Sequence, residues 1–285
     1  MNEAARDLAY AIPWRTSGVR IGAHRSYLSG SSGLFRDIVP LTSFPDPRRI
    51  AIRASLSDPF ERLLVRRAEQ PSSIDVVVLV DVSASMAFEG RCNKISVAAD
   101  LAEALAICAG RTGDTFALLP FDSTLRRDLV LWKTLSRAAQ LDAVERLRHA
   151  TTERKGAEGI AEAGGAIAGS RKLVFIISDF LWPESVAQAA ADALAFHDVV
   201  PIEIRDSLEL EDLPSWGLLN LRDLESGGHR LVAMRPSLKA QWLTLRSERR
   251  ARITRVLDAN SREMFTVRNS VDWMQLTAYL LYGAA

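Results

Sequence analysis

The sequence predicts an α/β fold in which helices cover both faces of a doubly wound, mostly parallel sheet. Two nearly unbroken apolar runs, 74–80 and 172–178, are rich in β-branched residues, which is typical of strands buried on both faces. From Ser73 onward such runs alternate with helical patterns, and parallel strands need crossover connections of that kind. With 48% hydrophobic and 25% charged residues among 285, the chain has an ordinary globular composition.

Each expected element follows from the spacing of its apolar residues. Helical spacing predicts helices at 94–111, 135–150, 159–168, 183–196 and 236–260. Continuous or alternating apolar residues predict strands at 74–80, 115–120, 172–178 and 199–204, an edge strand at 125–131 and a last strand at 230–233. The final helix carries an apolar stripe that we expect to be buried. The stripe consists of Leu238, Trp242, Leu245, Ile253 and Val256.

Composition divides the chain into three parts. Residues 1–70 contain eleven arginines and no lysine, and we expect extended segments at 49–54 and 63–67. This part is therefore predicted to be a β-rich subdomain. Residues 71–235 form the predicted α/β domain, and residues 236–285 form a C-terminal helical segment.

Charge and cysteine content exclude several classes of protein. Lys+Arg 36 against Asp+Glu 35 gives a formal net charge of +1, so we expect no nucleic-acid partner. No window reaches the roughly 20 apolar residues of a membrane span. The first ten residues carry Glu3, Arg6 and Asp7 and do not look like an export signal. With only two cysteines, the chain fits a reducing compartment, and we expect it to be cytoplasmic.

Polar side chains follow two of the predicted buried strands. Asp81 ends the first strand and opens an Asp-x-Ser-x-Ser pattern with Ser83 and Ser85, while Asp179 follows the strand at 172–178. Ligand sites of open parallel sheets form at such carboxyl ends. Carboxylate and hydroxyl oxygens are hard ligands that suit Mg²⁺ or Mn²⁺. The alternative interpretation is a loop in which the same side chains cap a helix N-terminus.

The donor set also predicts a type of chemistry. Serine hydroxyls are neutral, so the two carboxylates at most offset a doubly charged ion, and an open coordination position would bind an external Asp or Glu carboxylate. The competing hypothesis is a Mg²⁺-dependent phosphotransfer or hydrolytic enzyme that uses Asp81. Such enzymes have a second acid two residues further on, where this chain has Ser83. We therefore predict an interaction module rather than an enzyme.

Several segments resemble a known family. The stretch IDVVVLVDVSASM at 74–86 resembles the first strand and the metal-ion-dependent adhesion site of von Willebrand factor A domains. The segments 46–50, 64–67 and 177–180, the last with a Ser-Asp-Phe signature, resemble the bacterial domain-of-unknown-function family fifty-eight, whose members contain such a domain. The resemblance covers roughly residues 20–235 and implies a von Willebrand factor A-like fold.

The resemblance implies both a ligand set and partners. The implied metal ligands are Asp81, Ser83, Ser85, Asp179 and a middle-loop threonine, for which Thr152 is the candidate. Thr151 and Glu158 are the alternatives for that last position. Family members look like companions of MoxR-type AAA+ ATPases. The expected role is that of an adaptor or co-chaperone, and its expected partner is a MoxR-type AAA+ ATPase or a client of that ATPase.

Overall fold

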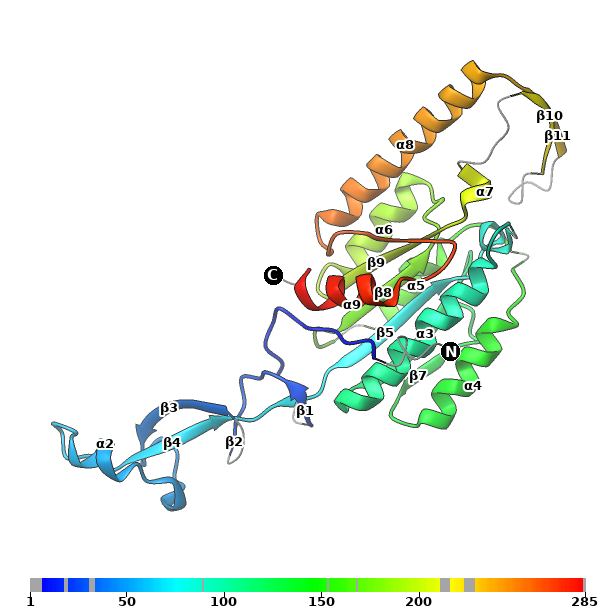
Figure 1. Ribbon diagram of the computed structural model, residues 1–285. Coiled ribbons are helices and arrows are strands. Elements are labelled where there is room, and N and C mark those ends of the chain that lie inside the picture. Colours follow the sequence, from blue (N-terminus) through cyan, green and yellow to red (C-terminus); the bar gives the residue numbers. More distant parts are fainter. Residues whose placement is uncertain are drawn as a thin grey trace. The chain divides into compact units, whose positions relative to one another are not determined.

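The computed structural model describes residues 7–17, 20–30, 34–88, 90–152, 154–167, 169–210, 216–222 and 229–283. The chain forms two compact units. One is Pro13–Ile74, and the other joins Met1–Ile12 with Asp75–Ala285. Figure 1 shows the elements of both units along the chain.

The larger unit is built on a six-stranded sheet of order β12-β9-β8-β5-β6-β7. All neighbouring strands are parallel except β7, which pairs antiparallel with β6. The strands are β5 (Asp75–Asp81), β6 (Thr115–Phe121), β7 (Leu131–Thr134), β8 (Leu173–Ser178), β9 (Asp198–Arg205) and β12 (Phe265–Arg268). The predicted α/β fold with a mostly parallel central sheet is thereby confirmed.

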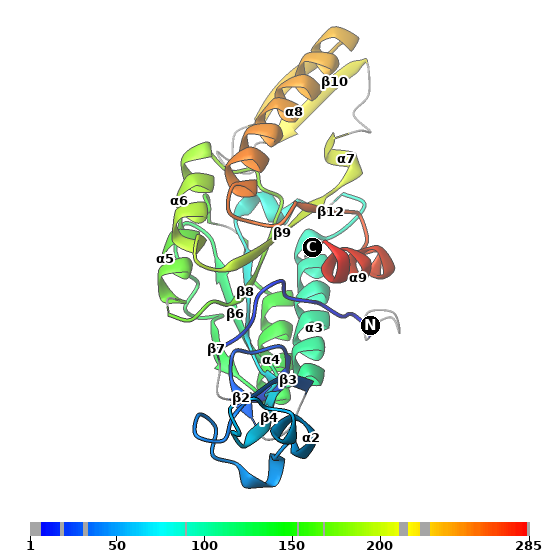
Figure 2. The ribbon, with the colours of Figure 1, turned by 90° about the vertical axis from the view of Figure 1, so that its left-hand side faces the viewer.

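Helices cover both faces of this sheet (Figure 2). On one face lie α3 (Lys94–Thr112) and α4 (Arg137–Arg148); on the other lie α5 (Gly159–Ala166), α6 (Glu184–Leu194) and α8 (Pro236–Asp258). Successive side chains of a strand point to opposite faces, so a strand covered on both sides needs apolar residues at every position. That explains why the whole run 76–80 of β5 is at most 2% exposed.

The order of the strands reverses at the centre of the sheet. From β5 the chain proceeds outward to β6 and β7, then returns to β8 on the other side of β5 and continues to β9 and β12. In open α/β sheets, ligand sites form outside the carboxyl ends of the strands at such a switch point. In this sheet, the switch point lies between the carboxyl ends of β5 and β8.

Two predicted strands differ from the structure. No strand forms at 125–130; the chain turns there, with the Arg126 amide hydrogen-bonded to the Pro120 carbonyl, and the edge strand β7 begins only at Leu131. The predicted last strand does form as β11 (His229–Met234), but it pairs with β10 (Gly217–Arg222) in a separate antiparallel hairpin. Local contacts decide both cases: Arg126 pairs with Asp122 and Asp128 within the turn, and β11 pairs with the strand that directly precedes it in the chain.

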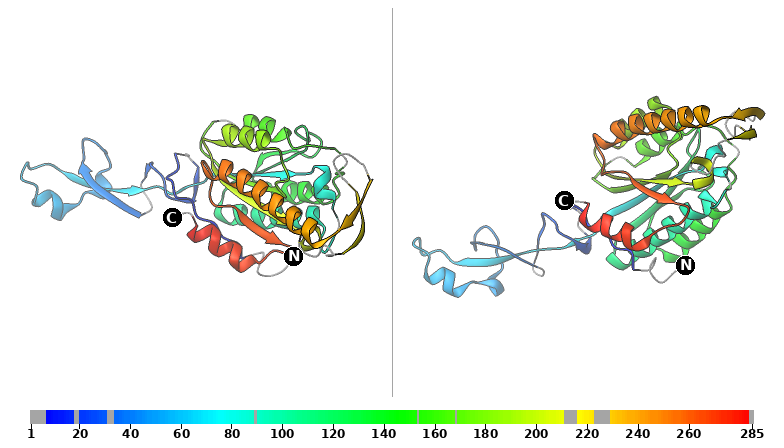
Figure 3. Two further views of the ribbon diagram at one scale, coloured as in Figure 1. Left: turned by 90° about the horizontal axis from the view of Figure 1, so that it is seen from above. Right: turned by 45° about the horizontal axis from the view of Figure 1, so that its top comes forward.

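The C-terminal part is not purely helical. Its strand β12 joins the edge of the central sheet beside β9, and α9 (Trp273–Tyr282) follows. Helix α8 packs against the α6 side of the sheet (Figure 3), but its stripe is buried only near the end, at Ile253, while Trp242 and Leu245 are 39% and 64% exposed. None of the described helices is both long and apolar enough to cross a bilayer.

The smaller unit contains a three-stranded antiparallel sheet of order β2-β4-β3. The strands of this sheet are β2 (Ser29–Gly30), β3 (Leu34–Pro40) and β4 (Leu64–Glu69), while β1 (Ile21–His24) makes isolated bridges to Ser72. The prediction of an extended segment at 49–54 is wrong, because η1 (Pro47–Arg49) and α2 (Ile52–Leu56) occupy most of this stretch. Asp46 accepts a hydrogen bond from the Arg48 amide, and Pro47 is preorganised for a first helical position, so the chain starts a helical turn there.

Candidate functional site

Asp81, the last residue of β5, is completely buried and fully hydrogen-bonded. Its Oδ1 accepts from the Ser83 amide at 2.9 Å. Its Oδ2 accepts from the Ser178 hydroxyl at 2.6 Å and from the Trp182 indole N–H at 2.8 Å. Three neutral donors from two strand ends therefore hold this carboxylate in one orientation.

The two serines lie on the turn that follows Asp81. Ser83 precedes the 3-10 turn η2 (Ala84–Ala87), which contains Ser85, so both side chains are held on one short segment. Their hydroxyl oxygens are 3.2 Å apart, and the Ser85 hydroxyl donates to Asp179 Oδ1 at 3.2 Å. Hydrogen bonds thus link four of the five predicted ligands, those at the ends of β5 and β8.

A strained backbone positions Asp179. The next residue, Phe180, has a φ of 50°, a left-handed conformation that is uncommon for a bulky side chain. Its amide donates to the Ser178 hydroxyl oxygen at 2.9 Å, and its buried ring lies 4.8 Å from that of Trp182. Such strain persists only where the surroundings enforce it, and it is frequent at functional sites.

Lys94 also belongs to this cluster, although it was not among the predicted site residues. It is the first residue of α3, is 0% exposed, and places its Nζ 2.8 Å from Asp179 Oδ2. The ammonium also donates to the Ser85 carbonyl at 3.3 Å. A cation in the first turn of a helix opposes the helix dipole, so a lysine there indicates a specific anionic partner.

Burial dominates the electrostatics of Asp81. Removal from water, together with the negative charge of Asp179, raises the pKa of Asp81, against the lowering effect of its hydrogen bonds. A positive ion bound between the two carboxylates would act in the opposite direction and favour their ionised forms.

The middle loop passes beside the Asp81 turn. The Ala84 amide donates to the Arg154 carbonyl at 2.8 Å, and Arg126 donates to the Thr151 carbonyl at 3.0 Å. Thr152 lies between these two points and is half-buried, but its hydroxyl has no hydrogen bond to the other described residues. Glu158 is exposed at the start of α5. The loop backbone is thus at the site, while its metal-ligand assignment stays a prediction.

The residues present fit a hard divalent cation. They offer carboxylate and hydroxyl oxygens only, the donor type that Mg²⁺ and Mn²⁺ prefer. Within the described part of the chain there is no group of three or more His, Cys, Asp or Glu side chains placed to hold a metal ion. Any metal here would therefore depend on the Ser83 and Ser85 hydroxyls and on water as well as on the two acids.

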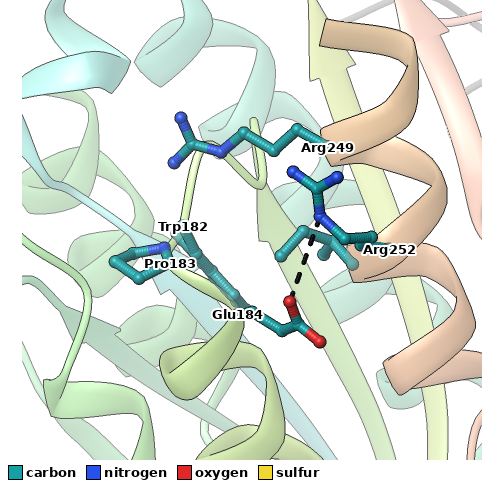
Figure 4. A pocket seen from close by; sticks show the side chains of 6 residues that line it. Trp182, Pro183, Glu184, Arg249 and Arg252 are labelled. Carbon is teal, nitrogen blue, oxygen red and sulfur yellow. Dashed lines mark ion pairs between the residues drawn. The ribbon is translucent and has the colours of Figure 1, made fainter. Parts of the chain in front are cut away.

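Trp182 also lines a pocket of about 210 Å³ (Figure 4). Arg249 and Arg252 of α8 face Trp182 and Glu184 across it, with Arg252 Nε 4.0 Å from Glu184 Oε2. The Arg249 side chain is also bonded to the Leu181 carbonyl, at 2.7 Å. The pocket is smaller than typical small-molecule sites, and neither Asp81 nor Asp179 lines it.

Comparison with known proteins identifies the family. BatB from Bacteroides thetaiotaomicron superposes with a TM-score of 0.44 at 13% identity, covering 73% of this chain and 96% of that one. The uncharacterized protein Mb1516 of Mycobacterium bovis is 24% identical over 281 residues, which cover 95% of this chain and 86% of that protein. MAV169 of Mycobacterium avium, also uncharacterized, is 30% identical over 104 residues, 36% of this chain and 61% of that protein. The family model described as "Protein of unknown function DUF58" matches residues 55–252, so this chain belongs to the DUF58 family.

Proposed function

We propose that the ends of β5 and β8 bind Mg²⁺ or Mn²⁺ and that the chain uses this ion to bind a carboxylate of a partner protein. The proposed ligands are Asp81, Ser83, Ser85 and Asp179, with Thr152 as the candidate from the middle loop. The observation that carries the proposal is the network that links two carboxylates and two hydroxyls, all at most 6% exposed, at the switch point of the sheet.

The charges of the cluster support a carboxylate as the incoming group. Two carboxylates and the Lys94 ammonium leave the cluster with one net negative charge. A divalent ion would turn this into one net positive charge in a site of low dielectric. Such a site attracts an anionic oxygen ligand, and an Asp or Glu side chain of a partner supplies one.

The proposed partner is a MoxR-type AAA+ ATPase or one of its clients, with this chain as an adaptor or co-chaperone. This choice rests on the resemblance of the sequence to a family whose members look like companions of such ATPases; the matching family model is itself described as one of unknown function. Capture of a purified MoxR-type ATPase by the immobilised chain, with and without EDTA, tests it. Capture that persists unchanged in EDTA would contradict a metal-dependent contact.

Metal binding is tested by titrating the full chain with Mn²⁺ in a calorimeter. The double variant Ser83→Ala with Ser85→Ala removes two proposed ligands with little change in volume, and we expect its Mn²⁺ affinity to fall at least tenfold. The matched control is Ser123→Ala, whose hydroxyl donates to Asp122 beyond the neighbouring strand β6. Equal affinities in all three proteins would remove the basis of the proposal.

The alternative, phosphotransfer or hydrolysis by Asp81, has less support. A nucleophilic carboxylate needs an accessible oxygen, whereas the Asp81 side chain is buried and its Oδ2 already accepts two hydrogen bonds. A phosphatase assay with Mg²⁺ distinguishes the two hypotheses. Turnover that disappears in Asp81→Asn would favour the enzyme.

A further inference from the structure

We propose that Lys94 is a tethered cation of this site and that its ammonium competes with the divalent ion for Asp179. The inference rests on the proposed function, because it concerns the occupancy of the same site. Its central observation is a fully buried ion pair: Lys94 Nζ lies 2.8 Å from Asp179 Oδ2, with side chains 0% and 3% exposed.

The contacts within this cluster account for a charged group at that position. Burial of an ammonium is strongly unfavourable unless it is paired and hydrogen-bonded. The helix dipole of α3 disfavours a cation at its first residue, so the surrounding oxygens must outweigh that effect. These oxygens include Asp179 Oδ2 and the Ser85 carbonyl, and the Phe88 ring centroid lies 5.7 Å from Nζ.

The two acids of the site therefore differ in their partners. Asp81 accepts hydrogen bonds from neutral groups only, the Ser83 amide, the Ser178 hydroxyl and the Trp182 indole. Asp179 accepts from Ser85 and from the Leu181 amide through Oδ1, but its Oδ2 is paired with a full positive charge. Of the two acids, Asp179 is therefore the one whose negative charge is neutralised by a side chain, that of Lys94.

A divalent ion that uses Asp179, directly or through water, meets this ammonium. Two positive charges at neighbouring positions in a buried site repel each other strongly, because little water screens them. The ion must either displace the flexible Lys94 side chain from Asp179 or bind against its repulsion, and both weaken metal binding. Lys94 thus keeps the site stable without metal and makes metal binding an exchange of cations.

Removal of the Lys94 charge should therefore tighten metal binding. In Lys94→Met, a side chain of similar length without charge takes the same space, and we expect the Mn²⁺ dissociation constant of the full chain to fall at least tenfold. Lys172→Met is the matched control, since it removes the same charge from a lysine 9% exposed at the start of β8, the opposite end of the strand from Asp179. We expect its Mn²⁺ affinity to stay within about twofold of wild type, as for a distant charge.

A second variant and a second measurement address folding. Lys94→Met leaves Asp179 buried without its counter-ion, so its melting temperature in EDTA should be below that of wild type. Lys94→Gln keeps a hydrogen-bond donor without charge and provides a milder replacement. In both variants, Mn²⁺ should raise the melting temperature by more than it does in wild type, because the stability added by a ligand increases with the logarithm of its affinity.

The outcomes separate this inference from the proposed function. If wild type binds Mn²⁺ and loses it on replacement of Ser83 and Ser85, but folded Lys94 variants bind no tighter, the competition is wrong and the metal site stands. If only the Lys94 variants bind Mn²⁺, the competition is supported and the wild-type chain has no metal-dependent function under those conditions. If none of the proteins binds Mn²⁺, both proposals are wrong.

Discussion

The two units of the chain differ in the share of their charged and large apolar side chains that they bury. The sheet unit buries charges, each with a partner: Asp81 with Trp182, Lys94 with Asp179, Arg262 with Asp198. The sheet unit also exposes a few large apolar side chains, such as Trp216 and Met274, but the small unit exposes a larger share of its own. Among those of the small unit are Ile21, Leu34, Phe35, Ile52, Leu56 and Phe60, each more than 60% exposed. A large core can surround a polar network, whereas a small sheet cannot cover even its apolar residues.

The contrast implies that chemically similar substitutions have different effects in the two units. A buried charge that loses its partner remains in a low dielectric, while an exposed one is solvated by water. The following pairs of variants test whether burial, rather than residue type, determines the effect.

The largest difference is expected for two bidentate Arg–Asp pairs. Arg262 donates to Asp198 at 2.7 and 2.9 Å with both side chains 6% exposed, and also to the Ala11 carbonyl. Arg262→Met should lower the free energy of unfolding by about 3–5 kcal/mol, because it leaves the Asp198 charge buried without a partner. Arg67→Met breaks the pair with Asp37, whose two side chains are 27% and 39% exposed. This variant should lower the free energy of unfolding by about 1 kcal/mol or less.

Urea unfolding followed by circular dichroism measures the first effect, and amide hydrogen exchange of β4 isolates the second in the small unit. Similar losses in both variants would mean that solvent does not screen the Arg67 pair and that the contrast between the units fails for ion pairs.

Apolar truncation should show the next largest difference. Leu79 lies in the middle of β5, is completely buried, and belongs to the core between the sheet, α5 and α6. Leu79→Ala should lower the free energy of unfolding by about 2–5 kcal/mol, since a cavity adds to the lost burial. Leu56→Ala truncates a side chain that is 83% exposed in α2, and its effect should stay within about 0.5 kcal/mol.

A larger loss of unfolding free energy in the Leu56 variant would indicate that Leu56 contacts another molecule in solution, because within the single chain this side chain is largely exposed. Analytical ultracentrifugation of both variants at the concentrations used for unfolding supplies that check.

The sequence correctly predicted the elements whose own residues show that they are buried. Strands β5 and β8 are apolar at consecutive positions, which only a strand covered on both faces explains. Strand β12 was missed, because its four residues become a strand only through pairing with β9, far away in the chain. The turn at 125–130 was missed for a similar reason, since Arg126 reaches the Thr151 carbonyl of a distant loop.

The same distinction applies to the candidate site. Asp81 and Asp179 could be placed together from sequence, because strand ends of one parallel sheet meet at one edge. The positions of Lys94 and Trp182 in the site could not be predicted in this way. Their long side chains reach the acids from other elements, and the spacing of residues in the sequence does not encode such contacts. For Lys94 a partial signal existed, a lysine in the first turn of a helix; for Trp182 the sequence offered none.

Two adjacent glycines of α5 give the smallest and most controlled comparison, since here the effect should change sign. A Cβ on Gly164 would lie 2.7 Å from Ala193 Cβ of α6, whereas a Cβ on Gly165 would meet no atom within 4 Å. Gly164→Ala should therefore lower the free energy of unfolding by about 1–3 kcal/mol through overpacking. Gly165→Ala should raise it by about 0.4–1 kcal/mol, because alanine restricts the unfolded chain and favours the helix.

Both variants gain the same helix propensity, so the difference between their urea midpoints isolates the contact with α6. Stabilisation by both would mean that α5 and α6 separate enough to admit a methyl group without loss. The packing on that face of the sheet, which also includes Phe180 and Trp182 beside the candidate site, would then be looser than the burial of these side chains indicates.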